Sequence, residues 1–258
     1  MQTTRLDTRQ FSGKCFAAQP VINEDVEDLL LFVQLAPIDG PKNIIGQAGP
    51  CAVHLPAYLT LMGFLQLDVA DLDLMLTEGT LDNVVLHEIG HIIGIGTLWG
   101  QITSSFSRNL LTGSGGSDPY FIGAVSRDQF ALLLPAFSGN PVPVENCITA
   151  AGATIPGCGA GTRDSHWRKS VFNTELMQGY SDPNMPMSKV TIGSLADLGY
   201  IVNLNAADPF SLQSALRASS ASEGTPLFND IADTPIWGVE RSGKSMLVRS
   251  AINPLKRY

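Results

Sequence analysis

The pentapeptide His87-Glu88-Ile89-Gly90-His91 constrains the fold of this 258-residue chain more than any other stretch. On a helix, histidines four residues apart project from one face, one turn apart, so both imidazoles can reach one small cation. The same spacing places the glutamate beside that cation. Zinc hydrolases use this pattern, with the glutamate as general base toward a metal-bound water. A buried helix that carries two histidines by chance is the alternative, and it does not account for the glutamate.

The residues around the pentapeptide predict a helix that ends just beyond it. Thr80 is a suitable N-cap, and the acidic Asp82 suits the positive end of the helix dipole. Gly94 occurs where the helix should stop, because a glycine can adopt a positive φ there and turn the chain sharply. His87 and His91 then belong to a stripe that faces a cleft. The expected apolar side consists of Leu81, Val85, Ile89, Ile92 and Ile93.

Short strands and one short helix are predicted before the pentapeptide. Residues 28–36 form a short apolar run that predicts a buried strand, and residues 59–68, with partial alternation, predict another. The glycines and proline of residues 46–50 predict a break between them. Asp68 can cap a helix that Gly79 ends.

Loops and short helices are predicted after the pentapeptide. Residues 126–134 form one helix, and Ser188 caps another that Gly199 ends. Prolines favour an extended conformation for residues 141–146, and residues 146–163 form a Gly-rich loop.

Charge and hydropathy exclude several classes of partner. The chain has 16 basic and 24 acidic residues and a net charge of −8, and it lacks a basic cluster. This composition argues against nucleic acids and anionic membranes as partners. No apolar run approaches the ~20 residues of a transmembrane helix. The first twenty residues are polar, so we expect no signal peptide in this chain, as in a mature secreted protein.

The chain has four cysteines, and none is in a CxxC pair, which disfavours a structural zinc knuckle. Cys147 and Cys158 bracket a Gly-rich loop that is short enough for a disulfide to close. Cys15 and Cys51 would then pair by elimination. Two disulfides would suit an extracytoplasmic protein, whereas four unlinked thiols would suit a cytosolic enzyme.

A catalytic zinc ion needs three protein ligands and one open position, and the predicted helix supplies two of them. His54 and His166 are the remaining histidines. Residue chemistry favours His166 as the third ligand. Glu175 is the next candidate, because a carboxylate fills this place in other zinc peptidases, and His54 and Asp164 are weaker ones.

Four motifs follow one another along the chain: His87-Glu88-x-x-His91-x-x-Gly94, His166-Trp167, Glu175-Leu176-Met177 and Ser194-Leu-Ala-Asp-Leu-Gly-Tyr. With these motifs the chain resembles the leishmanolysin family of metzincin zinc endopeptidases, in a compact bacterial-like form. Most metzincins place the third histidine just beyond the helix-ending glycine, where this chain has Thr97. The leishmanolysin group instead inserts a long segment, and residues 92–165 match that insertion. The similarity covers residues 20–205. The last of the four motifs lies in the predicted closing helix.

The resemblance implies an α+β fold with a mixed twisted sheet, a zinc-binding helix, and a C-terminal helix after a Met-turn. Residues 21–205 would form the metalloprotease domain, with residues 92–165 as its insertion. It assigns Met177 to the Met-turn, as an apolar floor beneath the metal. Composition describes residues 1–20 as a loose segment and residues 206–258 as an appendage with little core.

The resemblance also implies roles for single residues. One zinc ion would be held by His87, His91 and His166, and Glu88 would transfer the proton. Tyr180 is a candidate oxyanion contact, although a packing or surface role is the simpler alternative. Cys15 is a candidate zinc-capping cysteine, against a disulfide or a plain thiol.

Other features implied by the resemblance concern the surroundings of the metal. The strand near residues 61–67 would be the sheet edge that pairs with an extended substrate. Asp197 is a candidate partner of a ligand histidine, or else a solvated helix residue. Trp167 would wall the site or belong to the core.

We therefore expect an extracellular, cell-surface or periplasmic zinc metalloendopeptidase that acts on proteins or peptides. A catalytically silent, zinc-stabilised adhesion or binding module of the same fold is the alternative. Glu88 speaks against that alternative, because a purely structural zinc site has no use for a general base. A zinc peptidase with Glu175 as third ligand is a further possibility.

Overall fold

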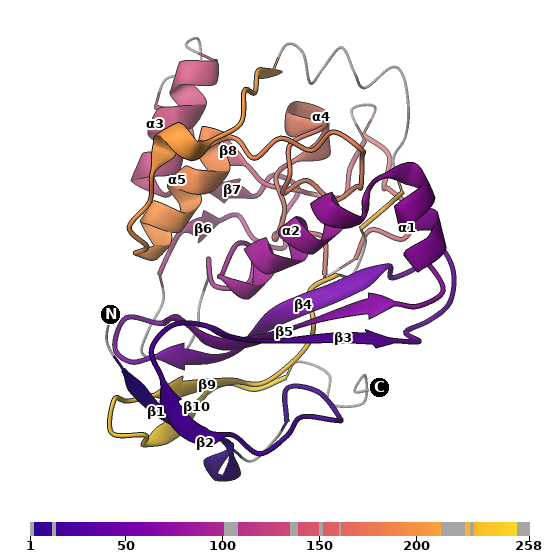
Figure 1. Ribbon diagram of the computed structural model, residues 1–258. Coiled ribbons are helices and arrows are strands. Elements are labelled where there is room, and N and C mark those ends of the chain that lie inside the picture. Colours follow the sequence, from indigo (N-terminus) through magenta and orange to yellow (C-terminus); the bar gives the residue numbers. More distant parts are fainter. Residues whose placement is uncertain are drawn as a thin grey trace.

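The computed structural model describes residues 3–11, 14–100, 108–134, 139–149, 152–159, 161–212, 225–227 and 230–251. The fold is of the α+β class that the sequence predicts. In Figure 1, helix α2 runs between a mixed sheet below it and a second layer above it, which contains α3, α5 and a small sheet.

The main sheet has five strands in the order β10-β9-β4-β5-β3. β5 is antiparallel to β4 and parallel to β3, while β9 is parallel to β4 and antiparallel to β10. Because β5 lies between two strands, the expectation that residues 61–67 form a sheet edge is wrong. The strands are β3 (Leu30–Ala36), β4 (Gly46–His54), β5 (Leu59–Asp68), β9 (Ile236–Val239) and β10 (Ser245–Arg249).

Two local predictions about this sheet are corrected. The expected break at residues 46–50 is the first half of β4, where backbone pairing with β5 outweighs the Gly and Pro signals. The run at residues 28–36 does form a strand, β3, but it lies at the sheet edge. Val33 and Leu35 are 60% and 57% exposed there, so the apolar run does not signify burial on both faces.

The N-terminal residues are not a loose segment. β1 (Thr4–Asp7) pairs antiparallel with β2 (Asn23–Val26), and a 3-10 turn, Thr8–Gln10, follows β1. Leu6 is fully buried, and a disulfide joins Cys15 to Cys51 of β4. The apolar side chains of this region cover the face of the sheet opposite α2.

The C-terminal residues also contribute to the core, contrary to the expectation from composition. β9 extends the main sheet beyond β4, and all four of its residues are buried. The ring of Trp237 stacks on Phe11 with a centroid distance of 4.9 Å. A strand that completes a sheet buries its side chains against its neighbours, whatever the polarity of the flanking sequence.

The helices near the metal motif lie close to where the sequence places them. α1 (Leu72–Glu78) ends at Gly79 with φ 67°, and α2 (Leu81–Ile92) is followed by Gly94 with φ 117°. Thr80 occupies the N-cap position of α2, but its side chain makes no capping hydrogen bond to the helix. The hydroxyl groups of Thr60 and Thr97 instead bond carbonyl oxygens at the C-terminal end of α2.

The second layer packs above α2 (Figure 1). Ser188 caps α5 by accepting a hydrogen bond from the amide of Thr191, and Gly199 ends that helix with φ 104°. The elements of this layer are β6 (Leu111–Thr112), β7 (Tyr120–Phe121), α3 (Ala124–Leu133), β8 (Val142–Pro143), α4 (Lys169–Phe172), α5 (Lys189–Leu198) and a 3-10 turn, Leu204–Ala206.

Both expected disulfides are present. Cys15–Cys51 joins residues 36 positions apart in the half of the molecule that contains the main sheet, which we call the sheet half. Cys147–Cys158 joins residues 11 positions apart in the second layer. Disulfides of this kind are typical of proteins in an oxidising, extracellular-type environment. Among the described residues, no helix is long and apolar enough to cross a membrane.

Candidate metal centre

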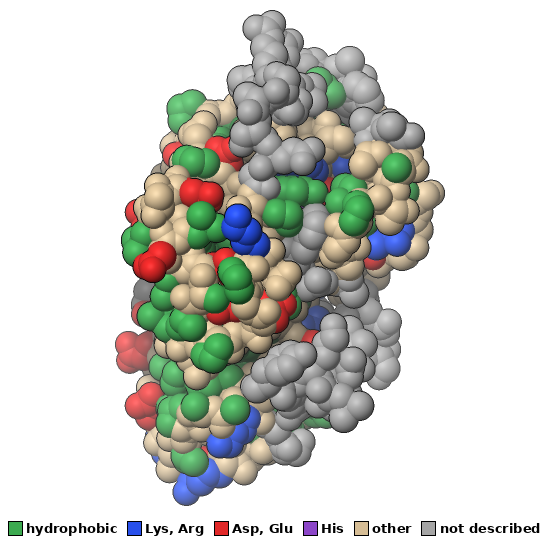
Figure 2. All heavy atoms as spheres, turned by 90° about the vertical axis from the view of Figure 1, so that its right-hand side faces the viewer, with side chains coloured by type: hydrophobic (Ala, Val, Ile, Leu, Met, Phe, Trp, Pro, Cys, Tyr) green, Lys and Arg blue, Asp and Glu red, His purple; other side chains and the backbone are tan. Residues whose placement is uncertain are grey.

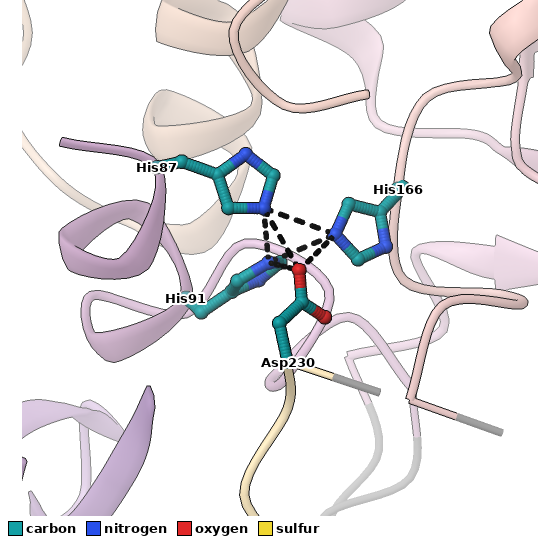
Figure 3. A group of neighbouring side chains, drawn as sticks. All are labelled: His87, His91, His166 and Asp230. Atoms are coloured by element: carbon teal, nitrogen blue, oxygen red, sulfur yellow. Dashed lines mark hydrogen bonds and ion pairs between the residues drawn. The ribbon is translucent and has the colours of Figure 1, made fainter. Parts of the chain in front are cut away.

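Three histidines from two distant parts of the chain converge on one point. α2 presents His87 and His91 one turn apart, and their Nε2 atoms are 3.0 Å from each other. The Nε2 atom of His166 is 3.1 Å from that of His87 and 3.0 Å from that of His91. Figure 3 shows the three rings pointing toward one another.

Gly96 allows the loop that carries His166 to approach the end of α2. It has φ 72°, and a Cβ atom built on it would lie 2.2 Å from the carbonyl oxygen of Ser165. No other residue type could accept both conditions without moving that loop. The carbonyl of His166 accepts a hydrogen bond from the amide of Glu145 at 2.8 Å, which holds the loop from its other side.

The second nitrogen of each ring is engaged by a backbone carbonyl. The Nδ1 atoms of His87, His91 and His166 lie 2.6, 2.9 and 3.0 Å from the carbonyl oxygens of Leu176, Ile95 and Thr162. A carbonyl can only accept, so each neutral ring carries its proton on Nδ1. Each Nε2 therefore directs a lone pair at the same point.

A fourth group completes the cluster. The Oδ2 atom of Asp230 is 3.1, 3.5 and 3.0 Å from the Nε2 atoms of His87, His91 and His166. It enters from the C-terminal segment, opposite the rings (Figure 3). Three lone pairs and a carboxylate that share one point repel one another unless a cation lies between them. A tetrahedral zinc ion with bonds of about 2.0–2.1 Å would hold its ligand atoms about 3.3 Å apart, close to the separations here.

The cluster is shielded from solvent. The three histidines are fully buried and Asp230 is 1% exposed. On the face drawn in Figure 2, no histidine side chain is visible among the described residues. Burial lowers the pKa of His87, against the opposing effect of its hydrogen bond to Asp230. A lowered pKa keeps the imidazole neutral, which is the form that binds a metal ion. The four residues could thus hold a metal ion.

Glu88 lies beside the cluster without belonging to it. It is fully buried, and neither of its carboxylate oxygens has a hydrogen-bond partner in the described structure. Burial raises its pKa well above the ordinary value, and the negative charge of Asp230 adds to this rise. Gly46 makes room for the carboxylate, since a Cβ atom built there would lie 3.1 Å from Oε1. A buried carboxyl with a raised pKa is suited to accept and release a proton near neutral pH.

Met177 packs against α2 between the two histidines of the helix. A Cβ atom built on Gly90 would lie 2.6 Å from its sulfur atom. The backbone carbonyl of Met177 accepts a hydrogen bond from the amide of Trp167, which ties this segment to the residue after His166. Met177 thus provides an apolar surface beneath the cluster.

Glu175 has a different place from the one that a metal ligand would need. It is fully buried and accepts hydrogen bonds from the amide of Met177 at 2.7 Å and from the amide and hydroxyl of Ser188 at 2.9 and 2.7 Å. The hydroxyl of Thr191 also donates to it. The pKa of Glu175 is raised, because burial raises it more than these hydrogen bonds lower it. The carboxylate joins the Met177 segment to the start of α5.

Three other candidates from the sequence lie outside the cluster. His54, at the end of β4, bonds the hydroxyl of Thr4 through Nδ1 at 2.9 Å. Asp164 accepts hydrogen bonds from the loop at residues 114–115. Cys15 is joined to Cys51, so it is not a free thiol that caps the metal.

The candidates proposed for the surroundings also have structural places. Asp197 accepts hydrogen bonds from the amides of Val125 and Ser126 at 2.9 Å and so caps α3 rather than orienting a histidine. Trp167 is fully buried in an aromatic core, 4.8 Å from Trp99 between ring centroids. Tyr180 is not a member of the metal-binding cluster, and its ring lies under the ammonium group of Lys169 at 4.3 Å.

Asp230 is the member of the cluster that the sequence did not reveal. It lies 64 residues beyond His166, and a second aspartate, Asp233, follows it three residues later. No spacing rule connects a ligand to a motif so far away. Asp230 reaches the cluster because its segment pairs with β4, and this pairing is a feature of the tertiary structure.

Comparison with known proteins adds no assignment, since no family model matches the chain and no curated protein matches it.

Proposed function

We propose that this protein is a zinc-dependent metalloendopeptidase of the leishmanolysin type, with Glu88 as general base. The observation that carries the proposal is the buried, unpartnered carboxylate of Glu88 beside three convergent imidazoles. Three histidines with a carboxylate oxygen suit zinc better than the harder cations, which prefer all-oxygen sites. A bound zinc ion would supply Lewis acidity toward a water molecule and a peptide carbonyl.

The protein's own residues have distinct tasks in this proposal. His87, His91 and His166 hold the ion, and the three backbone carbonyls fix the orientation of their rings. Glu88 accepts a proton from the attacking water and passes it to the leaving amine, for which a raised pKa is an advantage. The two disulfides favour a location outside the cytoplasm.

A second candidate function has its own support. Four protein ligands that close a site are typical of structural zinc, and Asp230 completes such a set here. The protein would then be a binding or adhesion module that zinc stabilises. This reading leaves Glu88 as a buried carboxylate without a purpose, at a cost in stability.

The test combines metal analysis with hydrolysis of a quenched fluorescent peptide library. The purified protein and the Asp230→Ala variant are assayed with and without chelator. We expect one zinc ion per chain and chelator-sensitive cleavage by at least one of the two forms. Glu88→Gln, introduced into the active form, should retain zinc and lose activity by about 10²–10⁴-fold.

Glu78→Gln is the matched control, because Glu78 is exposed at the end of α1. Cleavage that persists in the Glu88→Gln variant would overturn the assignment of the base. Stoichiometric zinc without cleavage by either form would favour the structural module.

A further inference from the structure

The C-terminal segment that carries Asp230 lies across the metal centre like a bound peptide. Residues 230–232 pair with β4: the amide of Ala48 donates to the carbonyl of Asp230 at 2.8 Å, and the amide of Ala232 donates to the carbonyl of Ala48 at 2.9 Å. Ile231 forms a parallel bridge with Ala48. One side of the segment is thus attached to the main sheet.

The preceding stretch pairs with the segment that follows Met177. The amide of Leu227 donates to the carbonyl of Gly179 at 3.0 Å, and the amide of Ser181 donates to the carbonyl of Thr225 at 2.8 Å. Leu227 is 1% exposed and belongs to the main hydrophobic core. Residues 225–227 thus pair with the segment at residues 179–181, and residues 230–232 pair with β4. These two partners form the two walls of the site, and we refer to residues 225–227 and 230–232 as the strap.

The strap occupies the groups that an extended substrate would use. A peptide that binds by strand addition needs free backbone donors and acceptors on the walls, and those of Ala48, Gly179 and Ser181 are taken by the strap. It also needs an open position on the metal for the reacting carbonyl and water. Asp230 lies within 3.5 Å of all three histidine nitrogens, where that position would be.

No protein donor accounts for the position of the Asp230 carboxylate, which indicates that the metal position accounts for it. Oδ1 is buried and has no hydrogen-bond partner in the described structure. Glu88 likewise has no hydrogen-bond partner in the described structure, so the site contains a second buried carboxylate besides Asp230. A site built only to hold a structural ion has no need for the second carboxylate.

We propose that the strap is an autoinhibitory element, which keeps the protein latent by placing the Asp230 carboxylate in the metal position and the strap backbone in the substrate position. This inference rests on the proposed peptidase function. The strap leaves the site by exchanging its backbone hydrogen bonds for those of a substrate or of water, so its release breaks no covalent bond. Activation then requires displacement of the strap.

The first experiment tests access to the metal and does not depend on catalysis. Wild type, Asp230→Ala and Asp230→Asn are loaded with cobalt(II), and visible absorption is followed during titration with acetohydroxamate, a small chelating anion. We expect the hydroxamate to bind Asp230→Ala at least about tenfold more tightly than wild type, because the competing ligand is gone. Asp230→Asn retains the size of the side chain and replaces Asp230→Ala if that variant does not fold.

Asp233→Asn is the matched control, because it removes a carboxylate from the same part of the chain outside the metal-binding cluster. It should resemble wild type. Equal hydroxamate affinity in wild type and in both Asp230 variants would overturn the inference, as would an equal gain from Asp233→Asn.

The second experiment separates this inference from the proposed function. The same proteins, loaded with zinc, are assayed on the peptide library. We expect the Asp230 variants to cleave at least about tenfold faster than wild type. Wild type that cleaves as fast as Asp230→Ala would overturn autoinhibition and leave the peptidase proposal intact. Hydroxamate access that only the Asp230 variants gain, without cleavage by any form, would support the blocking role of Asp230 and overturn the peptidase proposal.

Discussion

Gly96 is the residue on which the approach of His166 to α2 depends. Its φ of 72° and the 2.2 Å separation between a built Cβ atom and the Ser165 carbonyl oxygen leave no space for a side chain. The nearest atom, the carbonyl oxygen of Ser165, belongs to the backbone, and the backbone cannot turn aside as the end of a flexible side chain can. A metal ligand 75 residues from His91 is thus positioned by the absence of one methyl group.

We predict that Gly96→Ala weakens metal binding about 10–100-fold, because His166 is displaced together with Ser165. The free energy of unfolding should fall by about 2–5 kcal/mol, from backbone strain and overpacking together. Zinc titration against a competing chelator and urea denaturation measure the two effects.

Gly79→Ala is the matched control for the backbone strain alone. Gly79 has φ 67°, and a Cβ atom built there meets nothing within 4 Å. This variant should lose about 1–2 kcal/mol of stability and retain wild-type zinc affinity. Equal zinc affinities in the two variants would contradict the role given to Gly96.

At the scale of elements, the segment from His166 to α5 behaves as one unit. The carboxylate of Glu175 collects donors from the Met177 segment and from the first turn of α5. Met177 in turn packs against Gly90 of α2. A displacement of α5 would therefore also displace Met177, which lies beneath the metal cluster.

We predict that Glu175→Ala lowers the free energy of unfolding by about 3 kcal/mol, because several buried donors lose a charged acceptor. At saturating zinc the variant should still bind one ion per chain, whereas His166→Ala should not. Urea denaturation and metal analysis after gel filtration provide the measurements.

Glu78→Ala, at an exposed position of α1, is the control and should change neither quantity. Loss of zinc stoichiometry in Glu175→Ala with full retention in His166→Ala would reinstate Glu175 as the third ligand.

At the scale of the whole molecule, the metal cluster joins three regions that neither disulfide connects. Cys15–Cys51 lies within the sheet half and Cys147–Cys158 within the second layer. His87 and His91 belong to α2, His166 to the second layer, and Asp230 to the segment that leads to β9. A metal ion bound to all four would act as the cross-link between the layers.

We predict that the protein loses thermal stability as the pH falls below 6.5. The pKa of His87 is lowered from 6.5 in the folded protein by burial. The unfolded chain therefore takes up the proton first, so stability is fully present above 6.5 and declines below it. Protonation also competes with the metal, and zinc should leave the protein over the same pH interval.

Calorimetry and metal analysis across a pH series check this prediction. His54 also has a pKa lowered by burial, so His54→Gln serves to remove its share of the pH dependence of stability. Zinc release should be unchanged in that variant. Full zinc occupancy down to about pH 4.5, below the usual range of histidine titration, would contradict the prediction.

The sequence by itself determined the local features of this protein. The spacing of His87 and His91 fixes their common face, and Gly79, Gly94 and Gly199 mark helix ends, because these properties depend on neighbours within one or two turns. His166 could be predicted as the third ligand because the chain has few histidines. The two disulfides could be predicted because the chain has few cysteines.

Only the tertiary structure decided the remainder. The inner place of β5, the burial of β9, the approach at Gly96 and the presence of Asp230 in the metal cluster depend on which distant segments pair. Pairing over such separations is selected by the combined burial and backbone hydrogen bonding of the whole fold, and no short stretch of residues encodes it. For that reason the helix that presents the first two histidines could be predicted, whereas the strap that covers them could not.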